Sequence, residues 1–298
     1  MSKLPTDQAF TQPRSSHVAC LSPAGLHKMA YTEWGDPKNS RVLVCAHGLT
    51  RSGRDFDALA QRLSSDYRVI CPDVVGRGQS DWLANPTSYS LSQYVADMVT
   101  LIARLDVDTV DWLGTSMGGM IGLSLAGLPN TPIARLLLND IGPHLEPESL
   151  DRIVTYLGQP VSFKSEQEGI DYLAAVALSF GPHTPEQWRS LNGPLLHERD
   201  GIWQVRYDPQ ISVLFGSATP ESLAAGEAML WTLLENFSGP TLVVRGAESD
   251  LLSRDTVNAM KQRGKHISSA EIPGVGHAPT FVPDEQIRIA EAFFLGSH

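Results

Sequence analysis

The sequence is poor in the residues and runs that build disulfide frameworks, zinc sites and membrane spans. Its 298 residues include only three cysteines, Cys20, Cys45 and Cys71, with no CxxC spacing among them. This sparse, odd set argues against a disulfide framework and a cysteine-ligated zinc site. No stretch approaches the roughly 20 apolar residues that a membrane-spanning helix needs, and the start of the chain lacks the apolar run of a signal peptide. We therefore expect a cytoplasmic protein without a membrane partner, with buried, reduced thiols at Cys45 and Cys71.

The sequence also has fewer basic than acidic residues. The chain has 23 Lys and Arg against 33 Asp and Glu, a formal net charge of −10. Nucleic acids and anionic membrane surfaces attract clustered basic side chains, so neither is an expected partner. Apolar material is plentiful, because 42% of the residues are hydrophobic and 19% are charged. That composition predicts a globular chain with a large core, and it leaves both the substrate and the oligomeric state open.

Short β-prone runs alternate with helical patterns along most of the chain, at residues 42–46, 68–71, 109–113, 136–139, 241–245 and 268–272. Apolar residues at helical spacing predict helices at 56–63 and 95–102, and a terminal helix is expected over 284–295. An antiparallel strand pair is indicated at 17–21 and 28–34. Such alternation is typical of a mostly parallel α/β sheet.

The alternation stops between residues 141 and 238. This segment shows several helical patterns, frequent turn residues and no clear buried strand. Because it is too long for a plain loop, we interpret it as a helical insertion into the sheet domain.

The strongest chemical motif is centred on Ser116. It reads Gly114-Thr115-Ser116-Met117-Gly118-Gly119, directly after a predicted strand and directly before an apolar helical stretch. A serine held in such a strained turn needs small neighbours, and its hydroxyl then lies at the positive end of a helix. The Met117 N–H is free there to bind developing negative charge. The motif therefore predicts a nucleophilic serine.

A serine nucleophile needs a histidine base that is oriented by a carboxylate. His277 and Asp250 each follow a predicted strand, in the order Ser, Asp, His along the chain. Carboxyl ends of parallel strands meet at one edge of a sheet. Asp140 also ends a strand and is the alternative acid, but we favour Asp250 and interpret Asp140 as a hinge residue of the insertion.

Together these motifs resemble the α/β hydrolase family over nearly the whole chain. The resemblance is carried by His47-Gly48, the run at 73–80, the elbow at Ser116 and the downstream Asp250 and His277. It implies an α/β fold with a mostly parallel sheet of about eight strands flanked by helices. It also implies a core of residues 1–140 and 239–298, a helical cap at 141–238, and oxyanion N–H groups at Leu49 and Met117.

Several other residues receive structural interpretations. Asp73 and Gly78 belong to a turn that the family uses structurally, and His47 is expected to shape the oxyanion loop rather than act as a base. Arg51 follows that loop, where it is positioned either to hold a substrate carboxylate or to form a surface salt bridge.

The nucleophile narrows the chemistry. Haloalkane dehalogenases and epoxide hydrolases of similar fold place an aspartate at the elbow, so Ser116 argues against both. The leading hypothesis is a serine hydrolase that cleaves an ester or lactone of a small metabolite through an acyl-enzyme. A C–C bond hydrolase of aromatic catabolism is the second hypothesis, and a non-catalytic ligand-binding protein of the same fold is the third. No metal and no organic cofactor is expected.

Overall fold

The structure is a computed structural model and describes residues 12–296 apart from 147–148, 150–154, 156 and 218. Within these residues an eight-stranded sheet has the order β1-β2-β4-β3-β5-β6-β10-β11. The β1–β2 and β2–β4 pairs are antiparallel and every other neighbouring pair is parallel. The predicted fold class is thereby confirmed. The strands are β1 Arg14–Ser22, β2 Gly25–Trp34, β3 Val42–Ala46, β4 Arg68–Pro72, β5 Val110–Thr115, β6 Ile133–Asn139, β10 Thr241–Gly246 and β11 Ile267–Ile272.

Helices cover both faces of the sheet, so the central strands are buried on both sides. Val44 of β3 packs into one apolar cluster with α2, α3, α7 and α8, while the adjacent Cys45 packs into the other with α1 and α9. No helix in the described ranges is both long and apolar enough to cross a membrane. The helices of these two layers are α1 Asp57–Leu63, α2 Leu91–Arg104, α3 Met117–Ala126, α7 Pro220–Asn236, α8 Arg254–Arg263 and α9 Asp284–Leu295.

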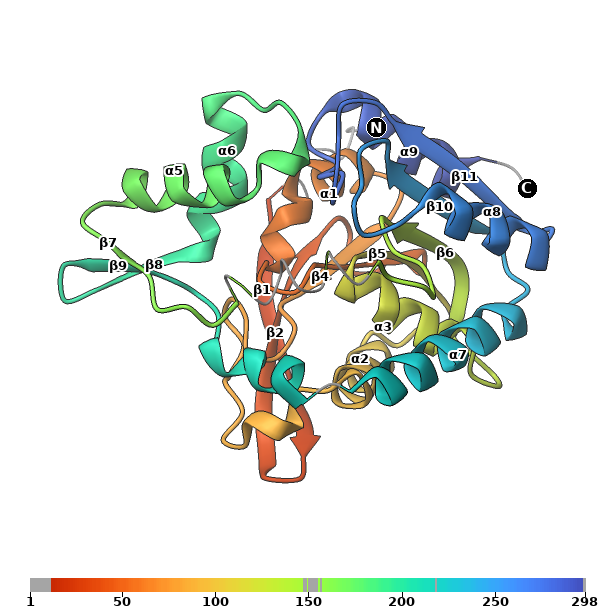
Figure 1. Cartoon of the computed structure of the whole chain (residues 1–298), viewed down its shortest axis with the longest axis horizontal. Helices are drawn as coiled ribbons and strands as arrows, with labels where there is room; N and C mark the ends of the chain where they lie inside the picture. Colours follow the sequence, from red (N-terminus) through yellow and green to blue (C-terminus); the bar gives the residue numbers. More distant parts are fainter. Residues whose placement is uncertain (1–11, 147–148, 150–154, 156, 218, 297–298) are drawn as a thin grey trace, which may run out of the picture.

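The segment between β6 and β10 contains strands that the sequence analysis missed. Three short strands form a separate antiparallel sheet in the order β7-β9-β8, packed against α5. Figure 1 shows this sheet with α5 and α6 at one side of the molecule, apart from the central sheet. The insertion therefore contains helices, as expected, together with a small sheet that the helical patterns did not predict. These elements are β7 Ser162–Phe163, α5 Glu166–Val176, α6 Pro185–Asn192, β8 Leu196–Arg199 and β9 Ile202–Val205.

The last helix of the predicted insertion belongs with the central layers. Leu230 and Leu234 of α7 pack into the cluster that contains α3, and α7 runs beside α3 in Figure 1. The two helices approach so closely that a Cβ at Gly127 would lie 2.5 Å from the backbone oxygen of Leu233. The domain boundaries at 140 and 239 stay a prediction. The part of the insertion that stands apart from the central sheet is the region of β7–β9, α5 and α6, which precedes α7.

Hydrogen bonds around residues 206–208 connect the inserted segment to the central domain, and short 3₁₀ turns complete the described structure. The backbone N–H of Asp208 donates to Gly76 O at 2.8 Å, and that of Gly78 donates to Arg206 O at 3.0 Å. Tyr89 donates its hydroxyl to the Asp208 carboxylate at 2.5 Å. These bonds fix the inserted segment to the turn after β4. The 3₁₀ turns are η1 Gly53–Phe56, η2 Pro86–Ser88, η3 Leu178–Phe180, η4 Gly193–Leu195 and η5 Pro209–Ser217.

Candidate active site

Ser116 stands between β5 and α3 in a strained backbone conformation, with φ 51° and ψ −115°. The glycines around it are required by close contacts rather than by their own φ. A Cβ at Gly118 would lie 2.0 Å from Ala46 O, and one at Gly114 would lie 2.2 Å from Gly118 O. Strain of this kind persists only when the surrounding structure imposes it, and it is concentrated at functional sites. The predicted strand–turn–helix setting is present.

His277 connects Ser116 to a buried carboxylate. Its Nε2 lies 3.1 Å from Ser116 Oγ, and its Nδ1 lies 2.7 Å from Oδ2 of Asp140. Asp140 is fully buried, at 0% exposure, and accepts further bonds from the Gly246 N–H at 2.8 Å and the Ser249 hydroxyl at 2.6 Å. This geometry lets His277 Nδ1–H donate to the carboxylate while Nε2 accepts the serine proton.

The structure corrects the prediction that Asp250 orients His277. Asp250 is exposed, and its backbone carbonyl accepts a hydrogen bond from the Ser149 hydroxyl. β6 and β10 are neighbours in the sheet, so the loops after both strands arrive at the same edge. The loop after β10 turns through a bond from Ser249 N–H to Gly246 O, which presents Ser249 to Asp140.

His47 shapes the loop beside the nucleophile. Its Nε2 accepts from the Val74 N–H at 3.0 Å, and its Nδ1 lies 2.6 Å from Gly48 O. Burial lowers the pKa of His47 to about 3, so the ring stays neutral. In a neutral imidazole one nitrogen donates and the other accepts, so Nδ1–H donates to Gly48 O while Nε2 accepts from Val74. These contacts agree with the structural role that the sequence predicted for His47.

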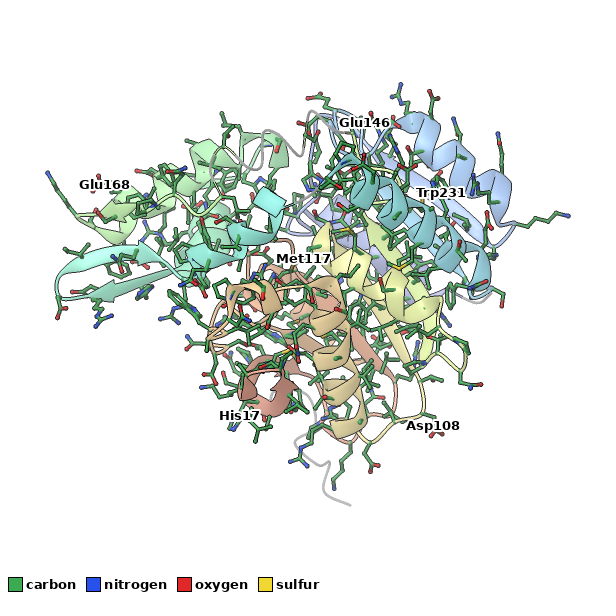
Figure 2. All side chains as sticks on the ribbon, turned by 60° about the horizontal axis from the view of Figure 1, so that its bottom comes forward. His17, Asp108, Met117, Glu146, Glu168 and Trp231 are labelled. Atoms are coloured by element: carbon green, nitrogen blue, oxygen red, sulfur yellow. The ribbon has the colours of Figure 1, made fainter. Side chains whose placement is uncertain are left out.

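The predicted oxyanion residues lie around Ser116. Met117 is the first residue of α3, and the N–H groups of a first helical turn have no carbonyl partner within the helix. Leu49 lines the same cavity as Ser116, and a Cβ at Gly48 would be 3.9 Å from the Ser116 Cβ. Figure 2 labels Met117 near the middle of the molecule, between the inserted segment marked by Glu168 and the helix that carries Trp231.

A cavity of about 130 Å³ opens at Ser116 beneath the inserted segment. Its lining is mostly apolar and comes from both the central domain and the insertion. The insertion also contacts the histidine loop directly, because the Ser179 hydroxyl donates to His277 O at 2.6 Å. The apolar residues contributed by the insertion are Leu173, Val176, Ala177, Phe180, Leu191, Leu195 and Val205.

Arg51 lines this cavity but is held by protein partners. Its guanidinium forms a bidentate ion pair with Asp55, with the shortest N–O distance 2.7 Å. It also donates to the side-chain oxygen of Asn192 and to the backbone oxygen of Leu191, each at 3.0 Å. Of the two predicted roles, the salt bridge is the one observed, although this pair is largely buried. The bonds from Arg51 to Leu191 and Asn192 join the loop after β3 to α6.

Two polar residues of the site escaped the sequence analysis. Ser249 donates to Asp140, and Asn139 donates its amide to Thr115 Oγ1 at 2.9 Å and to Pro279 O at 2.7 Å. Asn139 thereby joins the ends of β5 and β6 to the segment after His277. Asn139 is the last residue of β6 and Ser249 lies in the loop after β10, and each directly precedes an aspartate. The sequence could have flagged these positions but could not distinguish them from an ordinary turn.

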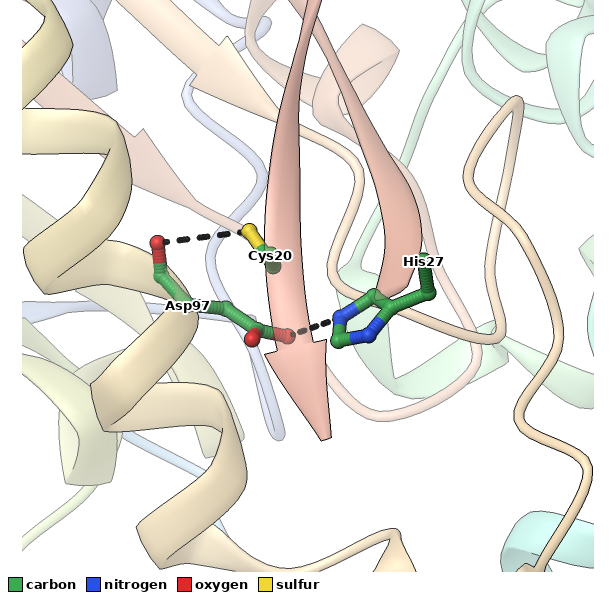
Figure 3. A group of neighbouring side chains, drawn as sticks. All are labelled: Cys20, His27 and Asp97. Carbon is green, nitrogen blue, oxygen red and sulfur yellow. Dashed lines mark hydrogen bonds and ion pairs between the residues drawn. The ribbon is translucent and has the colours of Figure 1, made fainter. Parts of the chain in front are cut away.

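Among the described residues, one group has the atom types of a metal site. The ligand atoms of Cys20, His27 and Asp97 lie within 4.8 Å of one another, between β1, β2 and α2 (Figure 3). The Asp97 carboxylate is already bonded to His27 Nε2 at 2.9 Å and to the Gln93 amide at 2.7 Å. Burial raises the pKa of the Cys20 thiol to about 12, so the thiol keeps its proton. We interpret the group as a hydrogen-bonded network that fixes α2 to the hairpin.

Sequence and structure comparisons agree with this fold. The chain belongs to the alpha/beta hydrolase family, whose model matches residues 43–289. A 3-hydroxybutyrate-oligomer hydrolase of Cupriavidus necator is 61% identical over 289 residues, covering 96% of this chain and 99% of the relative. The predicted class, a hydrolase of carboxylic esters, is confirmed by that likeness.

Solved structures give the same fold. An alpha/beta hydrolase from Novosphingobium aromaticivorans superposes with a TM-score of 0.83 at 31% identity, covering 95% of this chain and 98% of the other. The esterase Rv0045c of Mycobacterium tuberculosis superposes with a TM-score of 0.69 at 21% identity, covering 94% of this chain and 90% of the other. At that identity the second likeness concerns the fold alone.

Proposed function

We propose that this protein hydrolyses the ester bonds of 3-hydroxybutyrate oligomers through an acyl-enzyme on Ser116. The observation that carries the proposal is the 61% identity with the 3-hydroxybutyrate-oligomer hydrolase of Cupriavidus necator, over 96% of this chain and 99% of the relative. Units of such an oligomer are joined by carboxylic esters, the bond class that an activated serine attacks. The same likeness favours ester cleavage over the C–C bond hydrolysis considered from the sequence.

In the proposed mechanism Ser116 Oγ attacks the ester carbonyl carbon and His277 Nε2, 3.1 Å away, accepts the hydroxyl proton. Asp140 accepts the His277 Nδ1–H at 2.7 Å and stabilises the imidazolium that forms. The N–H groups of Leu49 and Met117 bind the carbonyl oxygen as it becomes negative.

The ester C–O bond then breaks, and His277 returns the proton to the leaving alkoxide. This leaves an acyl-enzyme and a shortened alcohol product. Water, activated by His277, releases the acyl group and restores Ser116. We also propose that the enzyme acts in the cytoplasm, where the buried thiols of Cys20, Cys45 and Cys71 stay reduced.

The direct test is to incubate the purified enzyme with a 3-hydroxybutyrate trimer and to quantify released monomer and dimer by liquid chromatography. Hydrolysis is expected, and Ser116→Ala should lower kcat by about 10⁴-fold or more. A fluorophosphonate probe should label Ser116, as located by peptide mass spectrometry. An inert trimer would reject the substrate, and an adduct on a different residue would reject the nucleophile.

A further inference from the structure

Arg51 is the one lysine or arginine among the described residues that line the cavity. A guanidinium has five N–H donors, and four of those in Arg51 are used within the protein. The Nε–H and one Nη2–H donate to the Asp55 carboxylate. The second Nη2–H donates to Leu191 O, and one Nη1–H donates to Asn192 Oδ1. A single N–H remains, so Arg51 cannot offer a carboxylate the paired donors that bidentate binding requires.

Asp55 cancels the charge of Arg51 inside the cavity. The two side chains are only 11% and 16% exposed, and burial raises the pKa of Asp55 while Arg51 opposes that rise. A substrate carboxylate entering here would lose its hydration, meet a carboxylate already in place and face mainly apolar side chains. Burial of an unpaired carboxylate is strongly unfavourable.

We propose that the cavity accepts only the uncharged, hydroxyl-terminal end of its ester substrate, so that the carboxylate end stays outside. This inference rests on the proposed ester hydrolysis and adds the direction in which an oligomer binds. The hydroxyl-terminal unit supplies the carbonyl that Ser116 attacks, and it becomes the neutral acyl group of the acyl-enzyme. The leaving alcohol carries the carboxylate end, receives the proton from His277 and departs toward solvent.

A matched pair of small esters tests the charge selection without an oligomer. Dimethyl succinate and monomethyl succinate present acyl groups of nearly equal length, one neutral and one anionic. We expect kcat/KM, measured by methanol release, to be at least about 100-fold higher for dimethyl succinate. Values within about threefold of each other, or a preference for the anion, would overturn the inference.

A second pair tests the direction of binding. The 3-hydroxybutyrate trimer and its carboxyl methyl ester should be cleaved between units with kcat/KM values within about threefold, since the carboxylate end is not recognised. A loss of about 100-fold on methylation would overturn the inference. If both trimers are inert while dimethyl succinate is hydrolysed, the proposed substrate fails and the succinate pair still decides the charge selection.

Variants of the ion pair assign the selection to Arg51 and Asp55. Asp55→Asn leaves Arg51 with an uncompensated charge, and we expect the ratio of kcat/KM for dimethyl over monomethyl succinate to fall at least about tenfold. The double variant Arg51→Met/Asp55→Asn removes both charges and should keep the wild-type ratio. Because each ratio is measured on one preparation, partial unfolding does not change it. An unchanged ratio in Asp55→Asn would contradict the role given to the pair.

Discussion

The carboxylate of Asp140 is the most completely partnered group of the site. It accepts bonds from a backbone N–H, a serine hydroxyl and the His277 imidazole, and none of its surface is exposed. Its backbone N–H donates in turn to Val244 O at 2.7 Å. The acid is therefore held by the sheet itself, and its orientation does not depend on a mobile side chain.

This placement leads to a direct comparison of two conservative variants. Asp140→Asn should lower kcat by about 10⁴-fold, because the amide favours the wrong imidazole tautomer. Asp250→Asn, on the exposed loop, should change kcat by less than about threefold. Both kcat values are measured with circular dichroism to verify folding. A severe loss in Asp250→Asn with an active Asp140→Asn would reverse the assignment.

His47 makes the folded protein sensitive to acid. Its pKa is about 3 in the folded state and near 6.5 in an unfolded chain, so below pH 6.5 the unfolded state binds the extra proton. Stability is therefore unaffected above pH 6.5 and is lost as pH falls from 6.5 toward 3, by at most about 1.4 kcal/mol per pH unit from this group.

The contribution of His47 is measured as a difference between two proteins. His47→Gln keeps a side-chain acceptor for the Val74 N–H but does not titrate. Urea unfolding at pH 7.5 and pH 5 should show a smaller loss of unfolding free energy in His47→Gln than in the wild type. Equal losses in both proteins would show that another group causes the acid sensitivity.

At the scale of elements, the sequence predicted most of the central sheet. The apolar runs and the terminal helix agree with β3, β4, β5, β6, β10 and α9, because a strand buried on both faces and an amphipathic helix have distinct patterns. The predicted strand at 268–272 agrees with β11, an edge strand whose central residues are exposed or half-buried. Val99 shows the limit of such patterns: it fits the apolar spacing of α2 yet is 49% exposed. Its exposure depends on where neighbouring elements end, which helical spacing does not encode.

The missed elements have the same cause. β7 has only two residues, and β8 and β9 each have four, with polar and charged side chains among them. Such strands exist through pairing with one another and carry no buried-strand signal of their own. The sequence could not decide whether Asp140 or Asp250 orients His277, because each follows one of two adjacent parallel strands. Only the conformation of the loop after β10 determines which carboxylate reaches the histidine.

The contact between α3 and β3 gives a prediction at this scale. Gly118→Ala would place a Cβ 2.0 Å from Ala46 O, which the rigid end of β3 cannot absorb. We expect a loss of about 3 kcal/mol or more in unfolding free energy, measured by urea titration. Gly226→Ala in α7 is the control, since it meets no atom within 4 Å and should stabilise by about 0.5–1 kcal/mol. Similar results for both would contradict the packing argument.

At the scale of the whole molecule, the inserted segment is fastened to the central domain beside the cavity. Asp208 is 2% exposed, and its carboxylate accepts a hydrogen bond from the Tyr89 hydroxyl. The same hydroxyl accepts a hydrogen bond from the Leu83 N–H at 2.8 Å. Asp208 directly follows Tyr207, which lines the cavity. The attachment therefore couples the position of the cavity wall to the turn after β4.

Tyr89→Phe should loosen this attachment without disturbing the sheet. Removal of the hydroxyl leaves a buried carboxylate without one of its donors, at a cost of roughly 1–3 kcal/mol. Hydrogen exchange should accelerate in peptides spanning 205–210 and stay unchanged in β5 and β6. Tyr172→Phe on α5 serves as the control for loss of a tyrosine hydroxyl. Uniform acceleration in all peptides would indicate global destabilisation instead.

Asp140 is the last residue before the predicted insertion begins. The acid is bonded to the neighbouring strand end through Val244 O and the Gly246 N–H, so its position is determined before the chain enters the inserted segment. During evolution, the segment that surrounds the substrate is therefore free to lengthen, shorten or be replaced while the reacting groups stay in register. A lineage built on this arrangement can acquire new substrates by exchanging one contiguous stretch of its gene.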